Sequence, residues 1–304
     1  MIAVAHDGTV YVTRREPGDC IMLRDTDGDG RANEQKTVVR KPQLHGIALD
    51  GNRVYLVTVK EVFVADRLQD GSFGALKQII GDLPDGGQRA SRTIAVGPDR
   101  MLYISVGSTC NACTETNKES ATLLRVSVDG TTREVFATGL RNTIGFGWHP
   151  QTRELWGIDH GIDWLGDSEQ GEEVNQLVYG ARYGWPYIFG KSQTNPADNP
   201  PGGLSHERWA KMSREPVLLY TAHSAPMQMA FYDSDQFPAE YRNSAFIAMH
   251  GSWNRKPPSG YEVVQLVFRD GKPIEFKPFL TGFLPQQDAG WTNSGRPVGG
   301  GNRS

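Results

Sequence analysis

The sequence predicts an all-β fold, a β-propeller with five complete four-stranded blades. A short hairpin recurs along the 304 residues, in which two alternating apolar runs flank a turn rich in Asp, Gly, Pro and Asn. These residue types supply the backbone angles of a tight reversal. The first four copies begin at Ile2, Ile47, Ile94 and Phe146, so they lie 45, 47 and 52 residues apart. A hairpin repeating at this interval is typical of propeller blades.

The composition is that of an ordinary globular protein. Hydrophobic residues make up 38% of the chain and charged residues 22%, and the net charge is -3. This balance gives no reason to expect a nucleic-acid partner, and we find no apolar run long enough to span a membrane. Met1 stands directly before the first strand, so we expect a trimmed or incomplete N-terminus from which the compartment cannot be read.

The blades follow one another along the chain as one domain, residues 1–304. Alternating apolar residues predict strands at Val54–Val59, Val62–Ala65 and Leu123–Val128. The fourth blade begins at Ile144, and a polar inserted region at about 160–215 interrupts it. We place this insertion, including its GEEVNQL stretch, outside the blade core, where binding sites tend to be built. The fifth blade ends at Leu280, and Gly295–Val298 looks like entry into a sixth inner strand.

One turn of the first blade resembles the start of a calcium loop. Asp25–Gly30 reads DTDGDG, with carboxylates at alternating positions and glycine at the sixth, but Lys36 stands where an EF-hand needs its twelfth, acidic residue. An Asp/Gly turn and a weak exposed calcium site both remain open.

Two of the three cysteines are close together in a loop. Cys110 and Cys113 fit a local disulfide, half of a zinc site or a redox pair. A second pair of zinc ligands and a strand-to-helix setting are not visible, so we favour the disulfide and with it an oxidising compartment. Cys20 we expect to be a small buried apolar residue.

Polar and cationic residues stand just before the inner strand of each blade. In a propeller these connections meet at one end of the central channel, so their side chains converge although they are far apart in sequence. Four arginines and two histidines there predict a positively charged pocket for a polyanionic ligand. The residues are His45, Arg89, Arg92, Arg141, Asn142, His223, Gln228 and Arg296.

Longer motifs carry a resemblance to a known family. GLRNTIGFGWHP at 139–150, the stretch at 159–177, RYGWP at 182–186, HSAPMQMAFY at 223–232 and HGSWNR at 250–255 look like the sorbosone/glucose dehydrogenase family. These are soluble propeller enzymes that depend on pyrroloquinoline quinone (PQQ), and the similarity covers nearly the whole chain. The resemblance implies a six-bladed propeller, of which the last blade is missing or truncated here.

The activity that the resemblance implies is oxidation of a CH–OH group. A sugar or sugar-derived aldehyde would pass hydride to PQQ, with Ca²⁺ polarising the quinone carbonyl and cations holding the carboxylates. An electron acceptor would then complete the cycle, in the periplasm or outside the cell. By similarity, backbone carbonyls of Gly161 and Ile162 with Asp163 nearby would hold calcium. The residues expected to bind the cofactor are Arg92, Arg141, Asn142, Arg255 and Arg296.

The general base departs from the family pattern. Gly86–Thr93 reads GGQRASRT, so Arg89 stands in the place of the family's catalytic histidine. A guanidinium stays protonated at ordinary pH and cannot accept a proton. Activity is then reduced, or His45 or His223 serves instead. We expect the other histidines, including His149 and His206, to be structural. Trp164, Trp185 and Trp253 could form apolar or stacking walls.

Two other classes of function compete with the dehydrogenase. A non-catalytic propeller could bind an anionic ligand or a protein partner through the same basic mouth, and Arg89 favours that alternative. A calcium-dependent lactone hydrolase would need carboxylates on the axis, where the sequence offers arginines. A ring that lacks one blade would also expose strand edges and lose one wall of its pocket.

Overall fold

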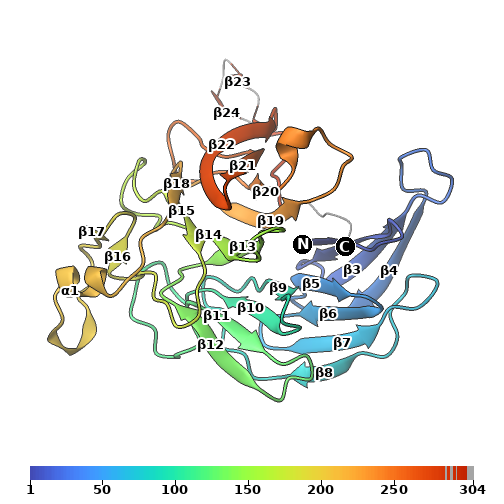
Figure 1. Cartoon of the computed structure of the whole chain (residues 1–304), viewed down its shortest axis with the longest axis horizontal. Coiled ribbons are helices and arrows are strands. Elements are labelled where there is room, and N and C mark those ends of the chain that lie inside the picture. Colours follow the sequence, from blue (N-terminus) through green and yellow to red (C-terminus); the bar gives the residue numbers. More distant parts are fainter. Residues whose placement is uncertain (285, 288–289, 292, 300–304) are drawn as a thin grey trace.

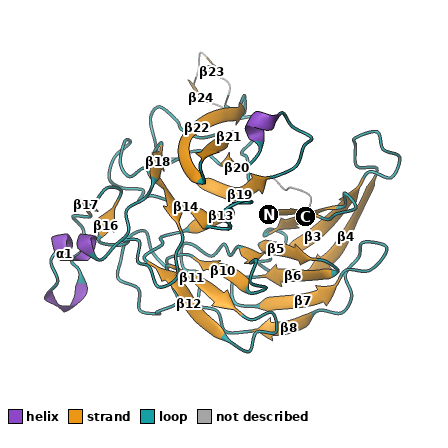
Figure 2. Cartoon of the chain, in the orientation of Figure 1, coloured by secondary structure: helices purple, strands orange, loops and turns teal. Residues whose placement is uncertain are grey.

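Five four-stranded antiparallel sheets are arranged around a common centre in the computed structural model (Figure 1), which describes residues 1–284, 286–287, 290–291 and 293–299. Strands and connecting loops make up almost all of the described chain (Figure 2). The predicted all-β propeller with five four-stranded blades is therefore confirmed.

Each of the first three blades is a run of four consecutive strands. Blade 1 consists of β1 (Ile2–Val4), β2 (Val10–Arg14), β3 (Asp19–Arg24) and β4 (Glu34–Arg40). Blade 2 consists of β5 (Gly46–Asp50), β6 (Arg53–Val57), β7 (Val62–Asp66) and β8 (Lys77–Ile80). Blade 3 consists of β9 (Ile94–Val96), β10 (Leu102–Val106), β11 (Thr122–Val126) and β12 (Arg133–Thr138).

The later blades carry the additional elements. Blade 4 consists of β13 (Thr143–Trp148), β14 (Leu155–Asp159), β15 (Glu172–Gln176) and β18 (Leu218–Tyr220). Blade 5 consists of β19 (Pro226–Tyr232), β20 (Ser244–Met249), β21 (Glu262–Arg269) and β22 (Lys272–Leu280). Outside the blades lie β16 (Ile188–Phe189), β17 (Gln193–Thr194), η1 (Pro201–Gly203), α1 (His206–Lys211), η2 (Ala239–Tyr241), β23 (Gln286–Gln287) and β24 (Gly290–Trp291).

Alternate residues of one strand pack against different neighbouring blades. In β6, Val54 and Leu56 belong to the apolar core shared with blade 1, whereas Tyr55 and Val57 belong to the core shared with blade 3. Successive side chains of a strand point to opposite faces of the sheet, so a blade between two others is apolar on both faces. Further cores lie between blades 3 and 4 and between blades 4 and 5.

Blades 5 and 1 meet at their inner strands. The side-chain amide of Gln228, in β19, accepts a hydrogen bond from the Ile2 backbone N–H (2.9 Å) and donates one to the Ile2 carbonyl (2.7 Å). The backbone N–H of Gln228 donates to the Val298 carbonyl at 3.2 Å. Gly295–Val298 therefore lies along the start of β19 and forms no strand of its own.

The inserted region is smaller than the sequence indicated. Residues 172–176, which we placed outside the blade core, form β15, the third strand of blade 4. The reason is that Val174 is fully buried while Glu172 and Glu173, also buried, take hydrogen bonds from the backbone N–H groups of Gly161 and Gly190. Buried carboxyl groups that receive such bonds tolerate a strand position. The true insertion lies between β15 and β18 and contains β16, β17, η1 and α1.

Two smaller expectations concern the hairpin loop of blade 1 and membrane spans. The Asp25 carboxylate accepts the backbone N–H groups of Gly28 (2.7 Å) and Gly30 (2.8 Å), which makes the loop an Asp/Gly turn. Asp25, Asp27 and Asp29 lie close enough to share a cation and are exposed. Among the described helices, none has the length and apolar character needed to cross a bilayer.

Candidate active site

A cavity of about 190 Å³ opens where loops from blades 3, 4 and 5 meet. These loops precede β9, β13 and β19 or follow β14 and β20, as expected for connections at one end of a propeller. The cavity is lined by Arg89, Arg141, Asn142, His160, Gly161, Asp163, Glu172, His223, Ala225 and Trp253. Four of the predicted site residues that precede inner strands therefore do come together: Arg89, Arg141, Asn142 and His223.

The Asp159 carboxylate at the end of β14 fixes the loop that carries Arg141 and Asn142. It accepts the backbone N–H of Arg141 (2.8 Å) and of Asn142 (2.7 Å) as well as the Thr143 hydroxyl (2.8 Å). Gly107 allows the loop before blade 3 to approach, because a Cβ there would lie 2.6 Å from both the Arg89 Cβ and the Asn142 Oδ1. The loops that carry Arg141 and Arg89 are therefore both fixed by residues from other segments of the chain.

Two guanidiniums share one carboxylate at the cavity wall. Asp163 Oδ2 lies 3.0 Å from Arg89 Nη2 and 2.9 Å from Arg141 Nη2. The Arg141 side chain is 1% exposed, and its burial, together with the charge of Arg89, lowers its pKa to about 10. Arg141 therefore still carries its charge at neutral pH, and the two arginines with Asp163 leave a net charge of about +1.

Part of each guanidinium is left without an acceptor by the part of the chain that the structure describes. Among the described residues, Nε and Nη1 of Arg89 and Nη1 of Arg141 make no hydrogen bond to the chain, although both residues line the cavity. Planar N–H donors with excess positive charge suit carboxylate, phosphate or quinone oxygens. The donors of this cavity are therefore compatible with an anionic ligand.

Two histidines line the cavity, and each has one nitrogen committed to a backbone carbonyl. His160 Nε2 donates to the Pro226 carbonyl (2.5 Å) and its Nδ1 lies 3.4 Å from Asn142 Nδ2. Burial lowers the pKa of His160 to about 3, so this ring is neutral. His223 Nε2 donates to the Gly166 carbonyl (2.8 Å), because a carbonyl can only accept. Its Nδ1 has no partner among the described residues.

The loop after β14 carries the residues expected to bind calcium. The backbone N–H groups of Gly161 and Ile162 donate to Glu172 Oε2 (2.9 Å) and Gln170 Oε1 (3.0 Å). The Asp163 carboxylate is neutralised by Arg89 and Arg141, so a divalent cation bound to it would stand next to two positive charges. That carboxylate does not fit a calcium ligand in this arrangement. Calcium binding by the carbonyls of Gly161 and Ile162 stays a prediction, and no step below relies on it.

The structure does not bring His45 and Arg92 to the cavity. His45 is 7% exposed and its Nδ1 lies 2.7 Å from the Arg92 carbonyl, and burial lowers the pKa of His45 to about 4. Arg92 is fully buried and donates to the carbonyls of Arg89 (2.9 Å) and Pro84 (3.0 Å). Arg92 therefore fastens the loop that presents Arg89 and does not itself face a ligand.

Arg255 and Arg296 also lie apart from the cavity. Arg255 Nε donates to the Asp167 carbonyl (2.8 Å), and the residue lines a neighbouring cavity of about 280 Å³. Arg296 donates to the Gly251 carbonyl (3.2 Å) and to the Tyr261 hydroxyl (3.0 Å), with its guanidinium 5.0 Å from the Tyr261 ring centre. Of the arginines that we predicted to form one positively charged pocket, only Arg89 and Arg141 line the cavity.

The three tryptophans considered as walls take different places. Trp253 is 75% exposed and lines the cavity, whereas Trp185 is buried in a small core with Ala121 and Ile162. Trp164 is 55% exposed and does not line this cavity. Only Trp253 can offer its ring to a ligand there.

The cysteine predictions are confirmed. Cys110 and Cys113 form a disulfide with an S–S distance of 1.97 Å. Cys20 is a buried free thiol, and burial raises its pKa to about 12.

Three residues of the site were not predicted. His160 follows β14 directly and Glu172 begins β15, the second and third strands of blade 4, so the position before an inner strand that identified Arg141 does not mark them. Glu172 is 2% exposed, and its burial raises the pKa of its carboxyl to about 7. The third residue, Asn111, receives hydrogen bonds from both cavity arginines, and no periodicity or motif marks it.

The fold is a β-propeller, and two arginines line a cavity among the loops at one end of its blades 3, 4 and 5. The sequence profile of the TrAA12-like family matches residues 1–284. The chain belongs to this family of AA12 PQQ-dependent oxidoreductases, which confirms the resemblance to PQQ-dependent propeller enzymes.

Individual relatives agree with this assignment. An uncharacterized protein of Borreliella burgdorferi is 32% identical over 271 residues, which are 83% of this chain and 68% of that protein. The PQQ-dependent pyranose dehydrogenase of Coprinopsis cinerea is 30% identical over 112 residues, 36% of this chain and only 14% of the relative. The matched residues are thus a small part of that enzyme.

Solved structures share the fold at low sequence identity. The calcium structure of the Trichoderma reesei carbohydrate-active family AA12 protein superposes with a TM-score of 0.79 at 19% identity, covering 96% of this chain and 89% of the other. The holo form of the C. cinerea pyranose dehydrogenase PQQ domain gives 0.71 at 18% identity, covering 98% and 78%. At these identities the likeness shows the fold.

Proposed function

We propose that this chain binds PQQ in the cavity between Arg89 and Arg141 and oxidises a sugar or a sugar-derived aldehyde. The observation that carries the proposal is the pair of guanidiniums with unpaired N–H groups facing one cavity. Membership of the TrAA12-like family supports it, as do the names of two relatives, the C. cinerea enzyme and the Escherichia coli aldose sugar dehydrogenase, which is 28% identical over 125 residues. These residues cover 40% of this chain and 30% of the E. coli protein.

The residues present fit an anionic planar cofactor. PQQ, when bound, supplies a two-electron oxidant that takes up hydride from the substrate. Arg89 and Arg141 would hold its oxygens and stabilise negative charge on them, and Asn142 adds an amide beside them. The exposed ring of Trp253 would cover one face and exclude water. A separate electron acceptor is needed to reoxidise the cofactor after each turnover.

His223 is the residue we assign to the substrate proton. Its Nε2–H is held by the Gly166 carbonyl, which leaves the Nδ1 lone pair as the accepting atom, and the residue lines the cavity. His223 adopts a φ of 63°, a strained conformation for a non-glycine residue that the surrounding structure must hold in place. His45, the other predicted base, is buried against Arg92 and away from the cavity.

Replacing His223 with glutamine tests this assignment. Glutamine can still donate to the Gly166 carbonyl but cannot accept a proton, so we expect turnover with a saturating sugar to fall by ~100-fold. The affinity for PQQ, measured by titration calorimetry, should change by less than about threefold, because Nδ1 makes no contact with the guanidiniums. His206→Gln, on α1, is the matched control. Equal turnover of H223Q and H206Q would rule out His223 as the base.

Arg89→His tests the dehydrogenase activity itself. Sugar-dependent reduction of a dye is followed after PQQ has been added. Arg89→His also removes one of the two guanidiniums proposed to hold PQQ, so PQQ affinity should fall and turnover is compared with PQQ saturating in both proteins. An imidazole at position 89, next to Asp163, adds a second base, so we expect turnover at saturating PQQ to rise by ~10-fold or more over the unmodified protein. Binding of PQQ without turnover in both proteins would favour the non-catalytic anion-binding propeller. No binding in either would exclude the dehydrogenase.

Compartment is part of the same proposal. The Cys110–Cys113 disulfide favours a periplasmic or secreted location, where such bonds persist.

A further inference from the structure

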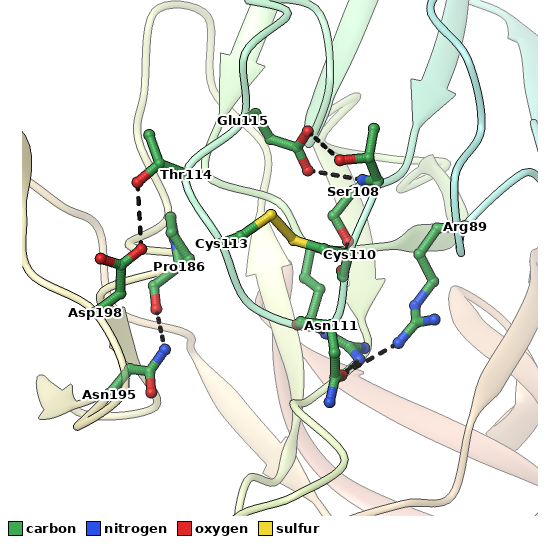
Figure 3. Close-up of a disulfide and its surroundings, with 12 residues drawn as sticks. Arg89, Ser108, Cys110, Asn111, Cys113, Thr114, Glu115, Pro186, Asn195 and Asp198 are labelled. Atoms are coloured by element: carbon green, nitrogen blue, oxygen red, sulfur yellow. Dashed lines mark hydrogen bonds between the residues drawn. A yellow bond between two sulfur atoms is a disulfide. The ribbon is translucent and has the colours of Figure 1, made fainter.

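The disulfide lies in the loop between β10 and β11, and Arg89, which lines the cavity, lies beside this loop (Figure 3). On one side of this loop Asn111 points toward Arg89, and on the other Thr114 points toward Asp198. The loop is also held by the Glu115 carboxylate, which accepts the Thr109 backbone N–H and hydroxyl, each at 2.7 Å. Its middle, residues 110–113, is closed by the disulfide.

Asn111 is the residue on which the two cavity arginines converge. Its backbone carbonyl accepts Arg141 Nε at 2.9 Å. Its side-chain Oδ1 accepts Arg141 Nη2 and, at 3.3 Å, both Arg89 Nη2 and the Asp163 backbone N–H. Both oxygens of this one residue therefore orient the guanidiniums. Asn111 does not itself line the cavity, so it can act on a ligand only through Arg89 and Arg141.

The two sulfurs flank Asn111 in the sequence and restrict its backbone. A cross-link of this kind lowers the number of conformations open to the residues inside it. The Arg141 Nε–H bond goes to a main-chain carbonyl inside the closed ring, so it needs that backbone in one orientation. Both cysteines are half-buried, which leaves the bond within reach of a small reductant. Reduction of the disulfide would therefore let the Asn111 backbone move, and the hydrogen bond from Arg141 Nε would be lost with it.

We propose that Asn111 is a positioning residue for the cavity guanidiniums, and that the Cys110–Cys113 disulfide makes ligand affinity dependent on the redox state of the protein. In the oxidised protein Arg89 and Arg141 are held for an anion. In the reduced protein Asn111 is released. An added phosphine supplies the two electrons and becomes a phosphine oxide, and water supplies its oxygen and the two protons of the new thiols. This inference rests on the anion-binding role proposed above.

The test measures PQQ affinity by titration calorimetry for the oxidised protein, the protein reduced with a phosphine, and three variants. We expect about tenfold weaker binding after reduction, in Cys110→Ser/Cys113→Ser and in Asn111→Ala, the loss that one hydrogen bond to a charged group represents. Thr114→Val is the matched control, because it breaks the contacts of the same loop with Tyr187 and Asp198 on the far side from the arginines. It should stay within about twofold of the unmodified protein. Cys20 does not confuse the comparison, since its thiol is buried with its pKa raised to about 12.

A second readout needs no ligand. The Arg141 Nε–H resonance, assigned by its absence from Arg141→Gln, should exchange slowly with solvent in the oxidised protein and in Thr114→Val. It should exchange faster after reduction and in the double serine variant. If oxidised protein binds no PQQ, the proposed function fails, and this exchange rate alone decides the inference. Unchanged exchange after reduction, or unchanged affinity where PQQ binds, would overturn it.

Discussion

Arg141→Gln is expected to weaken PQQ binding by ~100-fold, because a buried guanidinium that bonds an anion in a cavity contributes about 2–3 kcal/mol. Arg141 is the more deeply buried of the two cavity cations, at 1% exposure against 17% for Arg89, so less solvent screens its charge. Titration calorimetry at constant ionic strength measures the change. Arg141→Lys keeps the charge but loses the paired contacts with both oxygens of Asn111, so an intermediate loss of ~10-fold is expected.

The control for this prediction is Arg255→Gln. Arg255 is also cationic and was equally attractive in the sequence, but it bonds the Asp167 carbonyl and lines another cavity. Its replacement should change PQQ affinity by less than about threefold, as for a distant, independent site. A larger loss in R255Q than in R141Q would place the ligand in the neighbouring cavity instead. Circular dichroism of each variant separates loss of binding from loss of folding.

The second large effect is a dependence of stability on pH that Glu173 creates. Glu173, in β15, is 3% exposed, and burial followed by the charge of Asp159 raises its pKa from 4.5 to about 8. The folded protein therefore keeps a proton that the unfolded chain loses above pH 4.5. This stability is present below about pH 4.5 and is lost as the pH rises toward about 8.

Glu173→Gln removes that titration and keeps the acceptor for the Gly190 N–H. Between pH 5 and pH 9, the free energy of unfolding of the natural chain should fall by roughly 2–4 kcal/mol more than that of E173Q. Urea unfolding at each pH gives both curves. Glu207→Gln, with a side chain 79% exposed, serves as the control. Parallel curves for the natural chain and E173Q would show that Glu173 is ionised at little cost in the folded protein.

Sequence patterns were sufficient for the blades and for most of the residues that line the cavity. The hairpin period predicted all five sheets, because strands such as β6, which are apolar on both faces, must be covered by a neighbouring sheet on each side. Position before an inner strand also identified Arg89, Arg141, Asn142 and His223, since that position fixes where a residue lies along the axis.

The same rule failed for His45, Arg92 and Arg296 because it says nothing about side-chain direction. Each of these side chains turns to a nearby backbone carbonyl and away from the cavity. The strand β15 was not predicted because GEEVNQL is polar. Its two buried glutamates accept hydrogen bonds from the backbone N–H groups of Gly161 and Gly190, in two other loops, and these bonds cannot be predicted from the local sequence. Asn111 could not be found for a similar reason, as its role depends on contacts with residues 22 and 30 positions away.

The most direct test is a crystal structure of the oxidised chain soaked with PQQ. We expect electron density for the cofactor in the cavity beside Trp253, with its oxygens within hydrogen-bond distance of Arg89 and Arg141. Density lodged against Arg255 or Arg296, with the cavity beside Asp163 left to water, would contradict it.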